Sequence, residues 1–280
     1  MVLNSIKELQ KKAIQIRKEL TKMIYYSGGG HIGGSLSSAD ILVSLYYHIM
    51  NINPKQPEYD NRDRFILSKG HSVEAYYAIL NDLGFFPKEE INDYRKLGSR
   101  LIGHPNRKIP GVEMNTGALG HGLPIAVGMA LAGKMDNRNY KVYTLMGDGE
   151  LAEGSIWEAA MAGSNFNLDN LVAIIDRNKL QISGNTENIM KLENLVSRWS
   201  SFGWKVLEVD GNDINEIINA FNKLPVCKGK PHLIIAHTVK GKGISFVENN
   251  PKWHHNVPNK QQLQQALEEL DIKMMEAAKQ

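Results

Sequence analysis

The sequence predicts an α/β fold in which a parallel sheet carries helices on both of its faces. Short apolar runs rich in β-forming residues alternate along the chain with longer stretches of helical periodicity. Successive runs are far enough apart for helical crossovers, which parallel neighbours require. Polar or glycine-rich turns directly follow several runs, and ligands of such folds bind at the carboxyl ends of the strands.

The expected elements cover most of the 280 residues, a length near the limit for one hydrophobic core. Helical periodicity occupies residues 3–26, 38–50, 73–83, 124–135, 156–164, 192–202, 214–224 and 261–278. Strand-like runs occupy residues 65–67, 142–146, 171–175, 206–209 and 233–236. Residues 249–260, rich in Asn and Pro, form a linker-like stretch. We therefore expect a main domain over residues 1–250 and a helical extension over residues 251–280.

Composition excludes several classes of partner. The 33 Lys and Arg residues nearly balance the 30 Asp and Glu residues without a block of one sign, which argues against binding to nucleic acid. No apolar run has the length needed to cross a bilayer, and the lysine-rich N-terminal helix does not resemble a signal peptide. The single cysteine, Cys227, cannot form an internal disulfide. We expect a cytoplasmic protein that binds no membrane.

Polar side chains follow four of the predicted strands. They belong to the turns Ser68-Lys69-Gly70-His71, Gly147-Asp148-Gly149, Asn178 and His237. One crossover separates Asp148 from Asn178, so the oxygen atoms of both side chains can face one ion at the same edge of the sheet. Mg²⁺ and Ca²⁺ prefer such ligands. A carboxylate beside a phosphate also needs a cation, because two unit charges 4 Å apart repel by about 4 kcal/mol at an effective dielectric near 20.

The longest motif resembles a known cofactor signature. The stretch GDGELAEGSIWEAAMAGSNFNLDNLVAIIDRNKLQISG is similar to the thiamine diphosphate signature of transketolases. The similarity continues through SGGGHIGGSLS, SKGH, GHP, TGALGHG and KGKGISFVENNPKWHH, so that it covers most of the chain. This resemblance implies the thiamine diphosphate-binding fold of the type that holds the diphosphate group, known as a PP domain.

The resemblance also assigns a metal and cofactor site. It implies that Asp148, Asn178 and the backbone carbonyl of Leu180 hold Mg²⁺, which Ca²⁺ or Mn²⁺ can replace. Gly117 and Leu119 would receive the aminopyrimidine ring, and Ile182 would pack on the thiazolium ring. The full set of implied cofactor-binding residues is Lys69, His71, Gly117, Leu119, Asp148, Gly149, Asn178, Ile182, Lys240 and His254.

Catalytic roles follow from the same resemblance. It places four histidines near the substrate hydroxyls and the reacting end of the cofactor, namely His31, His71, His104 and His254. An imidazole suits this work because it donates, accepts or carries a proton near neutral pH. Other histidines are expected to be structural, namely His48, His232 and His255, whereas His237 is left open. At position 121 a histidine replaces the glutamine of many family members, which leaves substrate preference open.

Two glutamates have two interpretations of equal weight. Glu153 and Glu158 match a pair that relays protons between two active sites across a subunit interface in the family. They also fit as acids at the start of a helix, where the helix dipole favours negative charge.

In the family, a glutamate on a second domain activates the cofactor, and this sequence has no room for that domain before Gln280. We therefore expect a split transketolase in which two copies of this chain assemble with two copies of a complementary C-terminal subunit. The expected reaction transfers a two-carbon ketol unit from a ketose phosphate to an aldose. The alternatives are a deoxyxylulose-phosphate synthase-like enzyme, a specialised sugar-catabolic transketolase, or an inactive regulatory subunit that binds the cofactor.

Overall fold

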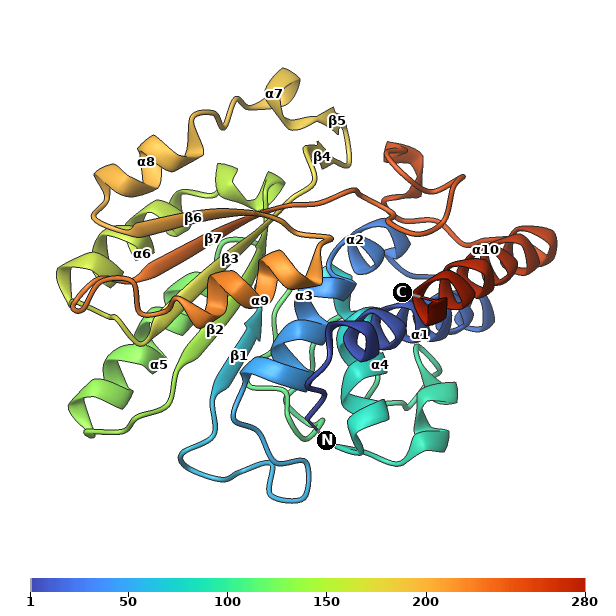
Figure 1. Ribbon diagram of the computed structural model, residues 1–280, viewed down its shortest axis with the longest axis horizontal. Coiled ribbons are helices and arrows are strands. Elements are labelled where there is room, and N and C mark those ends of the chain that lie inside the picture. The colour runs from blue at the N-terminus through green and yellow to red at the C-terminus, as the bar shows by residue number, and fades with distance from the viewer. Residues whose placement is uncertain (1, 280) are drawn as a thin grey trace.

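The computed structural model describes residues 2–279 and contains a parallel sheet of five strands. The strand order is β1-β2-β3-β7-β6, and every neighbouring pair is parallel (Figure 1). The strands are β1 (Arg64–Leu67), β2 (Val142–Gly147), β3 (Leu171–Arg177), β6 (Lys205–Asp210) and β7 (His232–His237). The prediction of a parallel α/β fold is confirmed, and each predicted strand is present with slightly wider bounds.

Helices cover both faces of the sheet. They are α1 (Ile6–Ser27), α2 (Ile32–Ser37), α3 (Ala39–Ser44), α4 (Val73–Leu83), α5 (Gly122–Met135), α6 (Gly154–Asn165), α7 (Thr186–Ile189), α8 (Leu195–Ser201), α9 (Ile214–Asn222) and α10 (Lys260–Lys279). Shorter helical turns are η1 (Leu45–Ile49), η2 (Gly70–Ser72), η3 (Lys88–Asp93), η4 (Gly149–Ala152) and η5 (Pro251–Trp253), and a small hairpin joins β4 (Leu180–Gln181) to β5 (Gly184–Asn185). None of the helices described within residues 2–279 is both long and apolar enough to cross a bilayer.

Alternate residues of each strand enter two separate cores, as the two-residue period of a strand requires. Phe65, Tyr143 and Ile174 belong to the core beneath α1, α3, α4 and α9. Ile66 and Ile175 belong to the core beneath α5, α6 and α8. Both faces of the central strands are therefore buried, which explains why their sequences read as continuous apolar runs.

Helix α2 is the main element that the periodicity does not predict. It contains Gly33 and Gly34, which disfavour helix formation in isolation. Both glycines allow close contact: a Cβ atom at Gly33 would lie 2.7 Å from the Trp253 carbonyl oxygen, and one at Gly34 would lie 2.4 Å from Ser72 Oγ. Tertiary packing therefore determines this helix, whose residues are all buried.

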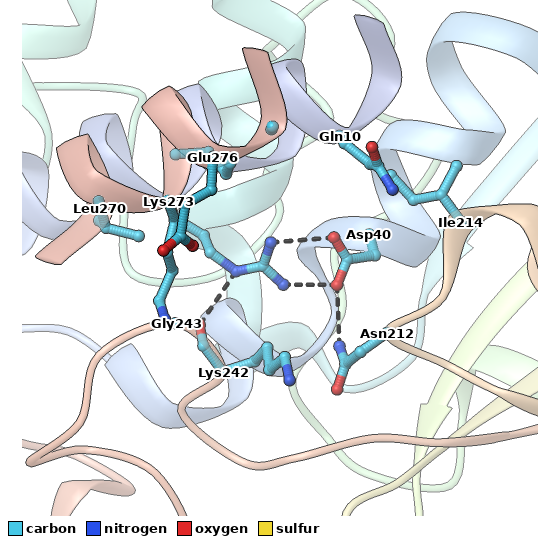
Figure 2. A pocket seen from close by; sticks show the side chains of 12 residues that line it. Gln10, Asp40, Asn212, Ile214, Lys242, Gly243, Leu270, Lys273 and Glu276 are labelled. Carbon is cyan, nitrogen blue, oxygen red and sulfur yellow. Dashed lines mark hydrogen bonds and ion pairs between the residues drawn. The ribbon is translucent and has the colours of Figure 1, made fainter. Parts of the chain in front are cut away.

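Helix α10 lies beside α1 and closes a cavity of about 230 Å³, which we call the Arg17–Asp40 cavity (Figure 1). Arg17 Nη1 and Nη2 donate to the two oxygens of Asp40 at 2.9 and 2.6 Å, and Arg17 Nε donates to the Lys242 carbonyl oxygen at 3.0 Å. Figure 2 shows Asp40 facing Asn212, whose Nδ2 donates to Asp40 Oδ2 at 2.9 Å. The buried charges of this cavity are therefore paired within the protein.

Candidate active site

A second cavity, of about 300 Å³, lies at the carboxyl ends of the central strands; we call it the sheet-edge cavity. All ten residues predicted to bind the cofactor line it, together with His31, Leu180 and Glu150. They come from segments after β1, β2, β3 and β7, from the loop before α5, and from the turn after η5. The register of the sheet explains this convergence, because Gly147 at the end of β2 lies opposite Asp176 near the end of β3.

Asp148 is buried and organises the turn that follows β3. Its Oδ2 accepts hydrogen bonds from the Lys179 amide at 2.5 Å and Arg177 Nη1 at 3.1 Å, and its Oδ1 accepts one from the Gly149 amide at 2.8 Å. Asn178 Oδ1 in turn accepts from the Leu180 amide at 3.1 Å. Burial raises the pKa of Asp148, with a smaller contribution from Asp176, whereas Arg177 opposes the shift. Hydrogen bonds therefore tie Asp148, which follows β2, to the turn after β3 that carries Asn178, the other predicted side-chain metal ligand.

The oxygen atoms gathered there suit a hard divalent cation. The Asp148 carboxylate comes from the turn after β2, the Asn178 amide and the Leu180 carbonyl come from the segment after β3, and all three residues line the sheet-edge cavity. Within residues 2–279, no group of three or more His, Cys, Asp and Glu side chains is arranged to hold a metal. A metal at this position would therefore depend on one carboxylate and on neutral oxygen donors, with room for phosphate oxygens or water.

Two buried lysines approach the sheet-edge cavity, and their surroundings differ. Lys69 forms an ion pair with Asp176, which also accepts a hydrogen bond from Ser37 Oγ at 2.6 Å. Burial alone would raise the pKa of Asp176, but Lys69 and the hydroxyl donors lower it overall. Lys240 is only 2% exposed and forms no ion pair within residues 2–279.

Lys240 instead has neutral partners. Its Nζ donates to the Leu180 carbonyl oxygen at 3.0 Å and lies 2.9 Å from His254 Nδ1. Burial, followed by the charge of Lys69, lowers the pKa of Lys240 to about 8. The carboxylates of Asp148 and Asp176 oppose this shift only in part, and neither forms an ion pair with Lys240. A buried ammonium without an ion-pair partner is costly, and a bound anion would relieve that cost.

Five imidazole rings form a cluster, and three of them, those of His31, His71 and His254, line the sheet-edge cavity. The centroid of the His31 ring lies 4.6 Å from that of His255, 5.3 Å from His71, 5.6 Å from His254 and 6.2 Å from His104. Burial is the largest cause of a pKa of about 4 for His31 and about 3 for His254. It also lowers the pKa values of His71 and His104. Near pH 7 these four rings are therefore neutral, with one donor and one acceptor nitrogen each.

The structure brings His104 to the site although it does not line the cavity. A Cβ atom at Gly117 would lie 2.5 Å from His104 Cδ2, and Gly117 has a φ of 136°, a conformation that favours glycine. His104 is therefore packed directly against the loop that the resemblance assigns to the aminopyrimidine ring.

His255, expected to be a structural histidine, lies next to the other imidazole rings. Its exposed ring lies beside His31, because the backbone at Asn256 forms a bridge with that at His31. Adjacency to His254 is the one signal that the sequence offers for this position.

The other histidines lie elsewhere. His48 and His232 bond to nearby backbone atoms, as expected of structural residues, and the ring of His237 contacts Glu208 at 2.8 Å. His121 is exposed at the start of α5.

Glu153 and Glu158 lie outside the sheet-edge cavity. Both are exposed, Glu153 at the start of α6 and Glu158 one turn further along the helix. Among the residues that line the cavity in the described chain, neither glutamate is present. Their role in proton relay stays a prediction.

Sequence reasoning missed three residues that build the site. Glu150 is buried and accepts hydrogen bonds from the amides of Gly120 at 2.9 Å and Gly147 at 3.0 Å, and from Ser68 Oγ. Asp176 anchors Lys69, and Arg177 orients Asp148. Asp176 and Arg177 lie at the end of β3, and Glu150 lies within the GDGE motif, so their positions alone could have indicated a role in the site. Their hydrogen-bond and ion-pair partners could not be predicted, because these depend on tertiary structure.

Comparison with known proteins identifies the family. The model of the family "Transketolase, thiamine diphosphate binding domain" matches residues 9–276. The chain is 51% identical to an apulose-4-phosphate transketolase subunit of Phocaeicola vulgatus, covering 95% of this chain and 94% of that protein. It is 43% identical to a 6-deoxy-6-sulfo-D-fructose transketolase subunit of Clostridium sp., covering 94% of this chain and 96% of that protein. Human transketolase is 38% identical over 95% of this chain but only 42% of its own length.

Solved structures agree with this assignment. Transketolase from Leishmania mexicana superposes with a TM-score of 0.87 at 26% identity, covering 99% of this chain and 45% of that one. Transketolase from Campylobacter jejuni gives a TM-score of 0.84 at 30% identity, covering 99% of this chain and 48% of that one. The chain thus spans less than half the length of these solved enzymes. From its sequence and its fold, this chain belongs to the transketolase family and carries the thiamine diphosphate binding domain of that family.

Proposed function

We propose that this chain is the N-terminal subunit of a two-chain transketolase, which moves a two-carbon ketol unit from a ketose phosphate to an aldose. The observation that carries the proposal is the sheet-edge cavity, where the buried Lys240, which forms no ion pair within residues 2–279, lies with the oxygen atoms of Asp148, Asn178 and Leu180. This combination suits a diphosphate bound through a divalent cation. When bound, thiamine diphosphate supplies the carbon nucleophile that the protein itself lacks.

The residues of the chain would bind and orient this cofactor. Asp148, Asn178 and the Leu180 carbonyl would hold Mg²⁺, and Lys240 would neutralise diphosphate oxygens. A Cβ atom at Gly149 would lie 3.0 Å from Gln181 Cβ, so glycine permits the close contact between these two segments that line the cavity. Ile182 lines the cavity and is 73% exposed, which supports a role as an apolar platform for the thiazolium ring.

The imidazole cluster would bind the sugar. Because His31, His71, His104 and His254 are neutral, they can donate to and accept from hydroxyl groups without a charge of their own. Their lowered pKa values result mainly from burial. His31 is central in this cluster and is therefore the best placed to orient the reacting end of the substrate.

A complementary polypeptide is part of the proposal, in two copies with two copies of this chain. The support is the near-complete coverage of relatives that are named as single subunits of a transketolase, together with the limited coverage of full-length transketolases. The exposed side chain of Ile182 at the cavity also favours closure by another polypeptide. Glu153 and Glu158 are exposed, which is compatible with a proton path across such an interface.

A specialised sugar-catabolic transketolase is the second candidate function. The observation that favours it is that relatives at 51% and 43% identity are named for apulose 4-phosphate and 6-deoxy-6-sulfo-D-fructose. The chemistry is the same two-carbon transfer, and only the sugar differs.

Reconstitution tests the proposed function. The chain would be purified from its native cell to identify its companion, and each would be assayed alone and mixed, with thiamine diphosphate and Mg²⁺. We expect no turnover of xylulose and ribose phosphates by this chain alone and ketol transfer by the mixture. Decarboxylation of pyruvate by the mixture would instead indicate a synthase. Robust ketol transfer without any companion would contradict the two-chain proposal.

A further inference from the structure

Helix α4 carries a buried polar face that contacts two of the histidines proposed to bind the sugar. Glu74 and Tyr77 lie three residues apart on this helix, so their side chains share one face. Both residues are fully buried. Glu74 contacts the backbone of His31, and Tyr77 contacts the backbone of His104. Neither of the two is among the described residues that line the sheet-edge cavity, so an effect on a bound sugar would act through the histidines.

Glu74 holds the first turn of α2 at two points. Its Oε1 accepts a hydrogen bond from the His31 amide at 2.9 Å, and its Oε2 accepts one from Ser35 Oγ at 2.7 Å. The Tyr94 hydroxyl also donates to Oε1, at 2.8 Å. A Cβ atom at Gly30 would lie 2.5 Å from Glu74 Oε1, so the absence of a side chain there lets the backbone approach the carboxylate. Two contacts on one turn fix both its position and its orientation.

Glu74 is a charge that the fold keeps at a cost. A buried carboxylate is expensive to desolvate, and within residues 2–279 Glu74 forms no ion pair. Its three donors are neutral groups, and hydrogen bonds from such groups to an ionised acceptor are about twice as strong as those between two neutral groups. Helix α2 contains Gly33 and Gly34, which give it little helical propensity of its own. The carboxylate therefore supplies order where the local sequence does not.

Tyr77 holds the segment that carries His104. Its hydroxyl donates to the His104 carbonyl oxygen at 2.6 Å. Between α4 and His104 the described chain contains only the short helical turn η3, so this bond joins the end of an irregular segment back to the helix at its start. Two side chains from one helix therefore set the spacing between the backbones of His31 and His104.

The ring nitrogens of these histidines have no partners of their own. Within residues 2–279, no hydrogen bond involves the ring nitrogens of His31, His71 or His104. Such nitrogens are available to the hydroxyl groups of a sugar. The placement of the rings then depends on the backbone that carries them, and a misplacement of about 1 Å can reduce a rate by about 100-fold. The contacts that α4 makes with this backbone are therefore of functional consequence.

We infer that α4 positions two imidazole rings for the sugar, His31 through Glu74 and His104 through Tyr77. This inference rests on the proposed function, in which these rings bind the hydroxyl groups of the sugar. Glu74 and Tyr77 are positioning residues, because they contact backbone atoms of the histidines. Since hydrogen bonds rather than charge hold the His31 turn, an uncharged acceptor of the same shape can replace the Glu74 carboxylate.

Double-mutant cycles on the complex of this chain with its complementary subunit test the inference. We expect Glu74→Leu to lower kcat/KM for ketol transfer by about 10- to 100-fold in the wild-type background, and by less than about threefold in a His31→Asn background. Tyr77→Phe should lower kcat/KM by about three- to tenfold, and this loss should disappear in a His104→Asn background. Losses of equal size in both backgrounds would overturn the inference, because a general structural role does not depend on the histidine.

Conservative variants separate positioning from charge and from stability. Glu74→Gln keeps an oxygen for the His31 amide and places its own amide group beside Ser35, whose hydroxyl can accept, so kcat/KM should stay within about threefold of the wild type. Tyr94→Phe removes another hydrogen bond to Glu74 and leaves the His31 contact, so it should lower stability while kcat/KM stays within about threefold. If either variant were as impaired as Glu74→Leu, positioning of His31 would not be the role of this carboxylate.

Cofactor binding checks the fold of each variant. Affinity for thiamine diphosphate with Mg²⁺, measured by calorimetry, should stay within about threefold of the wild type, and a parallel loss of affinity would show a general structural role instead. If Glu74→Leu does not fold, Ser35→Ala takes its place, with a loss of about three- to tenfold in kcat/KM that disappears in the His31→Asn background.

The results also distinguish this inference from the proposed function. An active wild-type complex in which the variants act independently of the histidines would overturn the role of α4 alone. A wild-type complex inactive on every ketose would overturn the proposed function and this inference together.

Discussion

The two cavities of this chain handle buried charge in opposite ways. In the Arg17–Asp40 cavity, Arg17 is 5% exposed and forms a two-point ion pair with Asp40. In the sheet-edge cavity, Lys240 is 2% exposed and its nearest polar partners, the Leu180 carbonyl and His254, are neutral. The cavities are similar in volume, about 230 and 300 Å³, so size does not distinguish them.

This difference in charge pairing indicates which of the two cavities binds a ligand. A buried ion pair with further hydrogen bonds is complete within the protein and serves the fold. A buried ammonium without a direct ion-pair partner is destabilising by itself, and a fold that retains one has a use for it. Convergence of side chains from separate segments on the second cavity, and on that ammonium, favours the same conclusion.

The largest expected effect comes from removal of the carboxylate that is predicted to bind the metal in the sheet-edge cavity. We expect Asp148→Ala to abolish Mg²⁺-dependent binding of thiamine diphosphate, with affinity reduced more than about 100-fold, because the ion loses its charged protein ligand. Titration calorimetry with and without Mg²⁺ measures this. An affinity equal to that of the wild type would contradict the metal assignment.

Breaking the ion pair of the other cavity should affect the fold alone. Arg17→Met leaves the Asp40 carboxylate buried without its cation, and we expect it to lower the free energy of unfolding by about 3–5 kcal/mol. Urea denaturation measures this, and the double variant Arg17→Met with Asp40→Leu should recover much of the loss. Affinity for thiamine diphosphate should stay within about threefold of the wild type. A large change in that affinity would erase the contrast between the cavities.

Removal of the unpaired ammonium should give the reverse pattern. We expect Lys240→Met to lower the affinity for thiamine diphosphate by about tenfold or more, because a charge-assisted contact is lost. The free energy of unfolding should stay the same or increase, since a buried charge without a direct ion-pair partner is removed. Lys242→Met, two residues along and lining the Arg17–Asp40 cavity, is the matched control and should bind normally. Lower stability with unchanged affinity would assign Lys240 to the fold.

The smallest expected effect concerns pH. His31 and His254, with pKa values of about 4 and 3, remain neutral where the same rings in the unfolded chain, with pKa values near 6.5, take up protons. Below pH 6.5 the unfolded state therefore binds more protons than the folded state. The free energy of unfolding consequently decreases as the pH falls from 6.5 toward 4.

Nuclear magnetic resonance should show both rings untitrated between pH 8 and pH 5.5. The difference in unfolding free energy between pH 7.5 and pH 5 should shrink when both residues are replaced by Asn. Titration midpoints near 6.5 would show that the rings are not desolvated.

Periodicity and strand context were sufficient to predict the fold. All five strands of the sheet and most helices follow from local patterns, because strands buried on both faces and amphipathic helices leave direct traces in the sequence. Helix α2 could not be predicted from a local pattern, since Gly33 and Gly34 disfavour helix formation. The close packing of Trp253 and Ser72 against these two positions explains why glycine is present there. The ten predicted cofactor residues could be named because the motifs that contain them resemble those of transketolases, and all ten line the sheet-edge cavity.

The support for those residues could not be predicted in the same way. Glu74, Glu150 and Asp176 act through partners distant in the sequence, such as Tyr94, Gly120 and Lys69. A glutamate in a helix reads as a solvated side chain until tertiary structure shows its burial. His255 entered the imidazole cluster through a backbone bridge at Asn256, which no local pattern specifies.

A crystal structure of this chain with its complementary subunit, thiamine diphosphate and Mg²⁺ tests the central claim most directly. We predict that the ion will contact Asp148, Asn178 and the Leu180 carbonyl, with the diphosphate beside Lys240 and the cofactor ring completed by the other polypeptide. A diphosphate bound away from these residues, with Asp148 remote from the ion, would contradict it.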